Sequence, residues 1–197
     1  FNGGSALSAG GDAAMAILVT HISAAAGAMT WMFYEWVKFG KPTALGSVTG
    51  MVAGLGTITP ASGFVGPAGA LVIGIIAGVV CFNAVIIIKQ KFKIDDSLDV
   101  FPVHGVGGIC GTMLVGFFAS KELGIFSGQG GWSHEAIVIS DQLQIQFTAV
   151  IATVAYTALA TFIILKLVDL VTGLRVDSQT EIQGLDLDSH GEKGYDL

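Results

Sequence analysis

His104 is the residue whose type and surroundings in this sequence are best suited to chemistry. It lies in the run Asp99-Val-Phe-Pro-Val-His104-Gly-Val-Gly-Gly, near the start of a stretch, 100–120, without any Asp, Glu, Lys or Arg. A neutral imidazole donates a hydrogen bond from one nitrogen and accepts one on the other. Such a group suits a path for a small hydrogen-bonding molecule or a proton relay. The alternative is a histidine that satisfies a neighbouring helix, but the adjacent glycines leave space beside the ring and favour function.

The other ionisable groups beside apolar stretches have simpler interpretations. His21 lies among polar side chains without flanking glycines, which favours a structural role. Asp99 comes directly before the stretch that holds His104. A carboxylate there stabilises the positive end of a helix, so we expect a cap or support for that helix. We interpret Asp95 and Asp96 as solvated loop acids.

The sequence carries no pattern typical of metal binding or bond-making catalysis. His134 and Glu135 are too few for a metal site, which needs three or four ligands. There is no phosphate-binding loop, nucleophile elbow or zinc-ligand spacing. Cys81 and Cys110 lie in apolar runs, and we interpret them as packing residues rather than a disulfide. We therefore predict neither an enzyme nor a cofactor.

Composition indicates what must position these side chains. The 197 residues are 52% hydrophobic and only 12% charged, with a mean hydropathy of +0.73. Soluble domains carry roughly a quarter charged residues. This composition excludes an ordinary soluble enzyme, a nucleic-acid binder and a disordered regulator. The sequence predicts an all-α, polytopic transmembrane helix bundle in contact with lipid.

Stretches without charged residues give the expected spans. A helix needs about 20 apolar residues to cross a bilayer. The long stretch between Lys41 and Lys89 is split by the small polar residues around Pro60, which indicate a turn. We expect five spans, at about 13–37, 43–60, 66–90, 101–120 and 142–170. An acidic tail, 171–197, follows the last span.

The positions of the basic residues predict an orientation. Lysine and arginine gather on the cytoplasmic side of membrane proteins. With five spans, eight of the nine Lys and Arg residues fall on one side, and only Lys121 falls on the other. We therefore expect an extracytoplasmic N-terminus and a cytoplasmic tail, in the plasma (inner) membrane. The 28 glycines, including the small-xxx-small pair Gly74 and Gly78, predict closely packed helices.

Short segments along the whole chain resemble one family. They are Phe1-Asn-Gly-Gly-Ser5, Glu35-Trp36, Gly40-Lys-Pro42, Thr59-Pro-Ala-Ser-Gly63, Asp95-Asp96, Asp99-Val-Phe-Pro-Val-His104-Gly, Gly173-Leu-Arg-Val176 and 184–192. Their order and combination resemble the ammonium transporter (Amt/Mep/Rh) family, and bacterial or archaeal Amt proteins in particular. The resemblance implies an eleven-span fold in two inverted halves, a homotrimer and one pore per subunit. It also implies that this chain is the second half and that the N-terminal half of the same protein is missing from it.

The resemblance assigns roles to individual residues. It implies that Phe1 is one ring of a gate above the pore, that Ser5 binds ammonium in the outer vestibule, and that His104 is one of two pore histidines. Asp99 matches a family aspartate at the start of the histidine's helix. The first gate phenylalanine, the vestibule tryptophan, the binding aspartate and the other histidine would belong to the missing half. Trp31, Trp36 and Trp132 do not match the vestibule motif.

The tail gives a further expectation. Its composition alone is compatible with a disordered terminus, but apolar residues recur among the charges, namely Leu174, Val176, Ile182, Leu185, Leu187 and Tyr195. We expect a folded regulatory tail with a contact segment that includes Gly184, Asp186, His190, Gly191 and Glu192. The resemblance adds a PII-type regulatory protein as a partner. The leading hypothesis is transport of ammonium or ammonia; the alternatives are an ammonium sensor with the same fold and an unrelated small channel.

Overall fold

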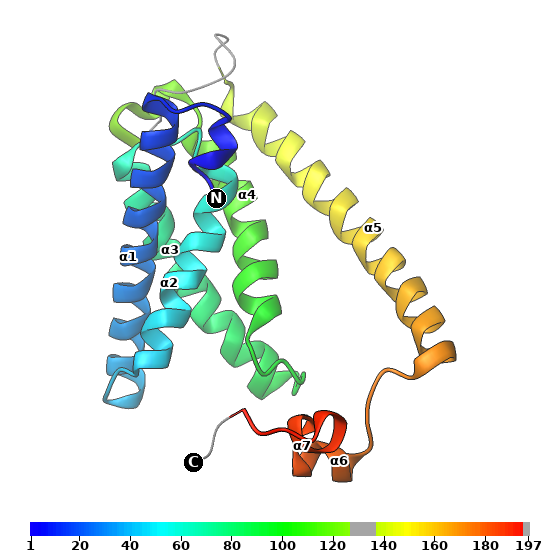
Figure 1. The fold of residues 1–197 in the computed structure, drawn as a ribbon. Helices are drawn as coiled ribbons and strands as arrows, with labels where there is room; N and C mark the ends of the chain where they lie inside the picture. The colour runs from blue at the N-terminus through cyan, green and yellow to red at the C-terminus, as the bar shows by residue number, and fades with distance from the viewer. Residues whose placement is uncertain (127–136, 195–197) are drawn as a thin grey trace. The chain divides into compact units, whose positions relative to one another are not determined.

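The structure, a computed structural model, describes residues 1–126 and 137–194, and every regular element in those two ranges is a helix (Figure 1). The predicted fold class is therefore confirmed. The helices are η1 (Gly4–Ala6), α1 (Gly11–Phe39), α2 (Ala44–Ile58), η2 (Thr59–Ala61), α3 (Pro67–Ile86), η3 (Ile87–Lys91), η4 (Phe101–Val106), α4 (Gly107–Phe118), η5 (Lys121–Phe126), α5 (Ile139–Thr172), α6 (Ser178–Gln183) and α7 (Leu185–His190). The chain forms two compact units, Phe1–Val150 and Ile151–Leu197, whose boundary lies inside α5.

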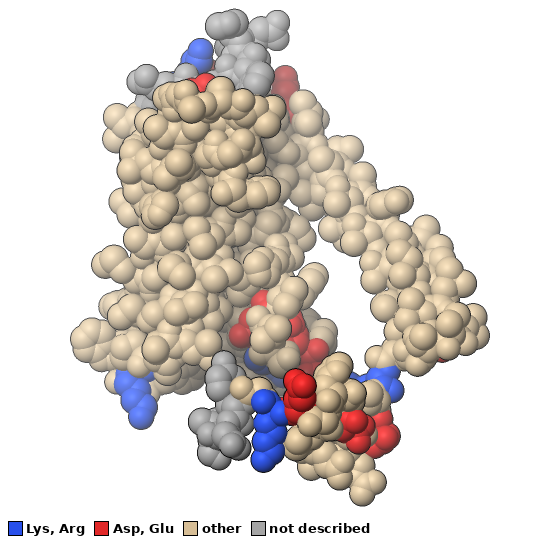
Figure 2. Space-filling view, viewed as in Figure 1, with Lys and Arg blue, Asp and Glu red and all other residues tan. Residues whose placement is uncertain are grey.

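Among the described residues, five helices are long and apolar enough to cross a membrane. They are Gly11–Phe39, Ala44–Ala61, Pro67–Lys91, Phe101–Phe118 and Ile139–Thr172. Their number equals the number of spans expected from the sequence, and their ends lie within about three residues of the expected ends. In the view of Figure 2, the charged side chains of the first unit lie near the helix ends and leave the middle of the helices uncharged.

Local signals explain where the helices begin and end. Gly40 terminates α1 with φ of +83°, a left-handed conformation that glycine adopts without strain. Thr43 then caps α2, because its hydroxyl accepts a hydrogen bond from the Gly46 amide at 2.9 Å. The Glu35 carboxylate, near the end of α1, accepts from the Thr43 amide at 2.7 Å and so joins α1 to α2. Pro67, in the first turn of α3, lacks the N–H that a helix start leaves unpaired.

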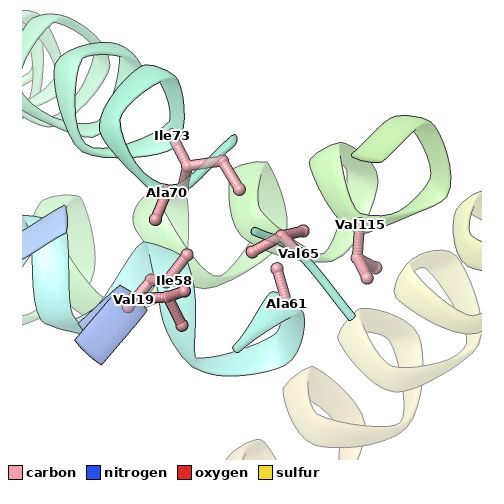
Figure 3. Packing of buried hydrophobic residues seen from close by; sticks show 7 residues of the cluster. All are labelled: Val19, Ile58, Ala61, Val65, Ala70, Ile73 and Val115. Atoms are coloured by element: carbon pink, nitrogen blue, oxygen red, sulfur yellow. The ribbon is translucent and has the colours of Figure 1, made fainter. Parts of the chain in front are cut away.

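Helices α1 to α4 pack around two clusters of buried apolar side chains. One apolar cluster joins α1, α2, η2, α3 and α4 through Val19, Ile58, Ala61, Val65, Ala70, Ile73 and Val115 (Figure 3). A second cluster includes Trp31, Ala53, Cys81, Phe82 and Val103. The rings of Trp31 and Phe82 meet edge to face with centroids 5.2 Å apart. Both clusters lie in the first unit.

Glycine lets these helices approach one another, as the sequence predicted. A Cβ built at Gly78 of α3 would lie 2.7 Å from Cβ of Thr30 in α1, and one at Gly74 would collide with the Ser23 carbonyl oxygen. Ser23 is fully buried, and its hydroxyl donates to the Gly54 carbonyl oxygen at 2.9 Å. These contacts bring α1 close to both α2 and α3. Without a hydrophobic drive between helices in lipid, such close packing is the main source of association.

The second unit has a folded end after the long helix. Asp177 caps α6, since its carboxylate accepts from the amides of Gln179 and Thr180 at 2.9 and 3.0 Å. Thr180 is buried, with 8% of its surface exposed. Its hydroxyl oxygen lies 3.2 Å from a carboxylate oxygen of Asp177 and 3.3 Å from one of Asp188, so its single proton is shared between α6 and α7. Arg175 forms an ion pair with Glu181. The residues of the tail that the structure describes therefore include two short helices held by their own side chains.

Candidate functional site

His104 lies in η4, a single turn of π-helix that leads directly into α4. Its side chain is exposed in this chain. A Cβ built at Gly56 of α2 would lie 4.0 Å from Nδ1 of His104, and one at Gly108 would meet nothing within 4 Å. The other two glycines next to His104 are crowded, since a Cβ would lie 2.9 Å from the Phe101 ring at Gly105 and 3.0 Å from the Thr57 hydroxyl oxygen at Gly107. The expectation that the glycines next to His104 leave space therefore fails at Gly105 and Gly107, and only Gly108 is open. Single π-helical turns are rare and often lie at functional sites.

Asp96 caps the helix that carries His104. Its two carboxylate oxygens accept from the amides of Val100 and Phe101, each at 2.9 Å. Pro102 supplies no amide in this first turn, so the cap satisfies donors that would otherwise remain unpaired. Our interpretation of Asp96 as a solvated loop acid was wrong, because the side chain is half-buried and holds the start of η4.

Asp99 interacts with a basic residue of another helix. It is one of three non-glycine residues with positive φ among the described residues, at +55°. Its Oδ1 lies 2.9 Å from Nζ of Lys89 in η3, and its carbonyl oxygen accepts from the Val103 amide at 3.0 Å. The side-chain cap expected of Asp99 is thus formed by Asp96, while Asp99 joins the end of α3 to the start of η4.

Phe1 and Ser5 form a turn at the N-terminus. The Ser5 hydroxyl and amide both donate to the Phe1 carbonyl oxygen, at 3.1 and 3.0 Å. The Asn2 side chain donates to the Thr20 hydroxyl of α1 at 3.0 Å, which attaches this turn to the bundle. The Phe1 ring is 98% exposed. This turn precedes α1, whereas Lys89 and Asp99 flank the loop between α3 and α4 at the other end of the first unit (Figure 1).

The remaining candidates have local roles. The His21 ring is exposed on α1, with Nδ1 2.9 Å from the carbonyl oxygen of Ile17 in the same helix. Cys81 and Cys110 are free thiols, and Cys81 is buried in an apolar cluster. Within residues 1–126 and 137–194 no three His, Cys, Asp or Glu side chains gather as metal ligands. Trp132, His134, Glu135 and Tyr195 lie outside the described residues.

The expected contact segment of the tail has a defined backbone. Gly184 separates α6 from α7 with φ of +97°, and Gly191 ends α7 with φ of +66°. His190 is the last residue of α7, and the Glu192 amide donates to the Asp186 carbonyl oxygen at 3.1 Å. Backbone amides lower the pKa of Asp177 below its ordinary value, and the Arg175 guanidinium lowers that of Glu181. The structure shows the fold of this segment, and its contact with a partner stays a prediction.

Three residues around the predicted site were not found from the sequence. Gly56 beside His104 belongs to a different helix, and no local pattern distinguishes it from the many glycines that only allow packing. Lys89 was counted among the basic residues that set orientation. Asn2 was part of the N-terminal motif and received no role. All three act through contacts with another segment of the chain, which residue spacing does not reveal.

Five apolar helices of membrane length, of which α1 to α4 pack closely through glycine, define a polytopic helical membrane protein. The profile of the Ammonium Transporter Family matches residues 1–195, and the chain belongs to that family. This is a family of transporters rather than enzymes, so both the predicted resemblance and the prediction of a non-enzyme are confirmed.

Relatives and solved structures agree with this assignment. The protein named Ammonium transporter Amt1 of Archaeoglobus fulgidus is 46% identical over 195 residues, which cover 99% of this chain and 48% of the relative. The Ammonium transporter of Bacillus subtilis is 44% identical over 195 residues, 99% of this chain and 47% of that protein. Among solved structures, one titled Sensor Amt Protein gives a TM-score of 0.84 at 30% identity and covers 96% of this chain and 45% of its own. The crystal structure of Saccharomyces cerevisiae Mep2 gives a TM-score of 0.72 at 36% identity and covers 87% of this chain and 41% of the Mep2 chain. The chain thus spans about half the length of the curated relatives it matches.

Proposed function

We propose that this chain provides half of a transmembrane pathway for ammonium or ammonia, in which His104 lines the pore. The observation that carries the proposal is the exposed imidazole in a glycine-flanked π-turn, in a chain of the ammonium transporter family. An exposed histidine in an apolar helix needs a polar neighbour. A second pore histidine from the half that this chain does not contain would supply it.

The proposed mechanism depends on a proton that can be separated from its carrier. Placing a bare cation in a narrow apolar pore is expensive, because burying an uncompensated charge costs many kcal/mol. A neutral imidazole can instead accept an N–H from the substrate at one nitrogen and donate from the other. The neutral molecule passes, while its proton travels separately or remains behind. Potassium has no proton to lose, so this pathway excludes it by chemistry.

Phe1 and Ser5 fit a role at the pathway entrance. The Ser5 hydroxyl proton is directed to the Phe1 carbonyl oxygen, so the lone pairs of Oγ are available to accept from ammonium. An aromatic face attracts a cation by about 0.5–2 kcal/mol, depending on how far the pair is desolvated. We assign Ser5 to recruitment and Phe1 to the gate. The gate, the vestibule and the twin histidines are complete only with the missing half.

The assembly and location follow from the same proposal. The whole protein is a homotrimer in the plasma (inner) membrane, with its tail in the cytoplasm, where a PII-type protein binds. A fusion of alkaline phosphatase to residue 197 would be inactive and a fluorescent protein at the same site would fluoresce, since the phosphatase matures only outside the cytoplasm. An active phosphatase fusion would contradict the orientation.

Transport by the complete protein tests the function. We expect liposomes that contain it to take up ammonium and its analogue methylammonium, each competing with the other, and to exclude potassium. The 197 residues reconstituted alone should give no uptake above that of empty liposomes, and co-expression with the N-terminal half as a separate chain should restore it. Equal uptake of potassium, or no uptake by the complete protein, would contradict the proposal.

A membrane sensor for ammonium is the second candidate. The similarity that favours it is the solved structure titled Sensor Amt Protein, with its TM-score of 0.84. A sensor would bind ammonium and change the state of a partner with little flux. Saturable binding of methylammonium to the purified complete protein, in the absence of uptake by liposomes, would favour the sensor over the transporter.

A further inference from the structure

We propose that Lys89 is a positioning residue for His104, which it acts on through its ion pair with Asp99. This inference deepens the proposed function, because it names a residue that sets the geometry of the pore histidine. Lys89 lies in η3 at the end of α3, and Asp99 lies two residues before η4. The pair therefore connects the two π-helical turns that flank the loop between α3 and α4.

The contact is short and partly shielded from water. Nζ of Lys89 lies 2.9 Å from Oδ1 of Asp99, and the two side chains are 38% and 20% exposed. The Oδ1 atom itself is buried, and its ion pair within the described residues is with Nζ of Lys89. The ammonium of Lys89 is therefore the charge that compensates this oxygen. Breaking such a pair by removing one partner is costly, because it leaves a charge buried without compensation.

Asp99 transmits this constraint to the helix of His104. Its carbonyl oxygen accepts from the Val103 amide, directly before His104, at 3.0 Å. Its φ of +55° is uncommon for a residue with a side chain and persists only where the surroundings hold it. Lys89, in η3 at the end of α3, holds the carboxylate of Asp99, while the backbone of Asp99 leads into η4. Asp96 holds the same turn through local capping bonds, so Lys89 supplies the link to a neighbouring helix.

This role differs from that of a loop lysine that only sets membrane orientation. Lys91 lies two residues further along η3 and contributes the same charge at the same side of the bundle. In the part of the chain that the structure describes, Asp99 forms its ion pair with Lys89 and not with Lys91. Lys91→Met is therefore a control matched in charge, size and location.

The test compares Lys89→Met, Lys89→Arg and Lys91→Met in the complete protein in liposomes. We expect Lys89→Met to lower the maximal uptake rate of methylammonium by about tenfold or more, because small displacements of a functional group have large effects. The half-saturation concentration should change by less than about twofold, since capture occurs at the other end of the pathway. Lys89→Arg should keep most of the rate, and Lys91→Met should keep all of it.

A readout independent of transport accompanies the rate. We expect amide hydrogen exchange in the peptide 100–106 to accelerate in Lys89→Met and to remain unchanged in Lys91→Met. If the unmodified complete protein carries no methylammonium, the proposed function fails, and the exchange comparison alone decides whether Lys89 holds η4. If Lys89→Met does not insert, the double variant Lys89→Met, Asp99→Asn removes the uncompensated charge, and it should insert with slow uptake and fast exchange.

Some results would overturn the inference. Wild-type uptake and wild-type exchange in Lys89→Met would show that the pair does not position η4. If Lys89→Met and Lys91→Met lowered the maximal uptake rate equally, the loss of positive charge, and not the contact with Asp99, would explain the effect. A double variant with wild-type rate and exchange would also exclude the positioning role.

Discussion

Gly56 of α2 lies beside the imidazole of His104. A methyl group at Gly56 would be 4.0 Å from Nδ1 and 3.7 Å from the Val103 carbonyl oxygen, which is ordinary van der Waals contact. Gly111 of α4 differs, because a methyl group there would collide with the Thr57 carbonyl oxygen. One glycine therefore leaves room near the proposed pathway, while the other lets two helices touch.

This difference predicts opposite phenotypes. Gly56→Ala should insert normally and retain most uptake, whereas Gly56→Leu should fill the space at the ring and lower uptake severalfold without loss of thermal stability. Gly111→Ala should destabilise the helix contact by about 1–3 kcal/mol through overpacking. Uptake rates in liposomes and thermal unfolding in detergent distinguish the effects of substitution at Gly56 from those at Gly111. A Gly56→Leu variant with full uptake would show that the space beside His104 is not used.

Substitutions in the N-terminal turn should separate capture from passage. Ser5→Ala removes the oxygen proposed to accept from ammonium, so the half-saturation concentration should rise more than the maximal rate falls. Phe1→Ala should alter selectivity and competition by methylammonium. Uptake kinetics at several substrate concentrations measure both. If both variants keep the kinetics and competition of the unmodified protein, the vestibule assignment is wrong.

Deletion of the residues after Gly173 should change uptake or its regulation without preventing membrane insertion. The expected reason is that α6 and α7 form a folded element that acts on the cytoplasmic side. Uptake, binding of a PII-type protein and trimer stability are the three measurements. A deletion variant that matches the unmodified protein in all three would show that the tail is passive.

Acid should unfold α6. The pKa of Asp177 is lowered from its ordinary value of 3.8 because the amides of Thr180 and Gln179 donate to the charged carboxylate. A lowered folded-state pKa means that the capping contribution is complete above about 3.8 and is lost as pH falls through the lower, folded-state value. Carboxyl NMR titration should therefore find Asp177 below 3.8, and Asp177→Asn should remove this acid dependence. An Asp177 pKa at or above the ordinary value would contradict the cap.

The five long apolar helices were predictable because each depends on local composition. Charge-free stretches locate the apolar helices, and Pro60 with its small polar neighbours marks the break where α2 gives way to η2 before α3 begins at Pro67. The sequence also predicted the helix that carries His104, because a histidine within an apolar, uncharged stretch is easily recognised. These features are fixed by side chains close together in the sequence.

The contacts that hold the site were not predictable in this way. The π-turn of η4 and the ion pair between Lys89 and Asp99 depend on how α3 meets α4, which no residue spacing specifies. The tail shows the same limit. The apolar residues that suggested docking, among them Ile182 and Leu187, remain exposed within their own unit at 86% and 43%. Docking of the tail therefore remains a prediction.

The role of His104 in the pathway is tested most directly by the initial rate of methylammonium uptake into liposomes that contain the complete protein, either unmodified or with His104→Ala. We expect His104→Ala to abolish methylammonium uptake or to admit potassium, while the protein inserts and assembles as before. An unchanged rate together with unchanged exclusion of potassium would contradict the claim that His104 lines the pathway.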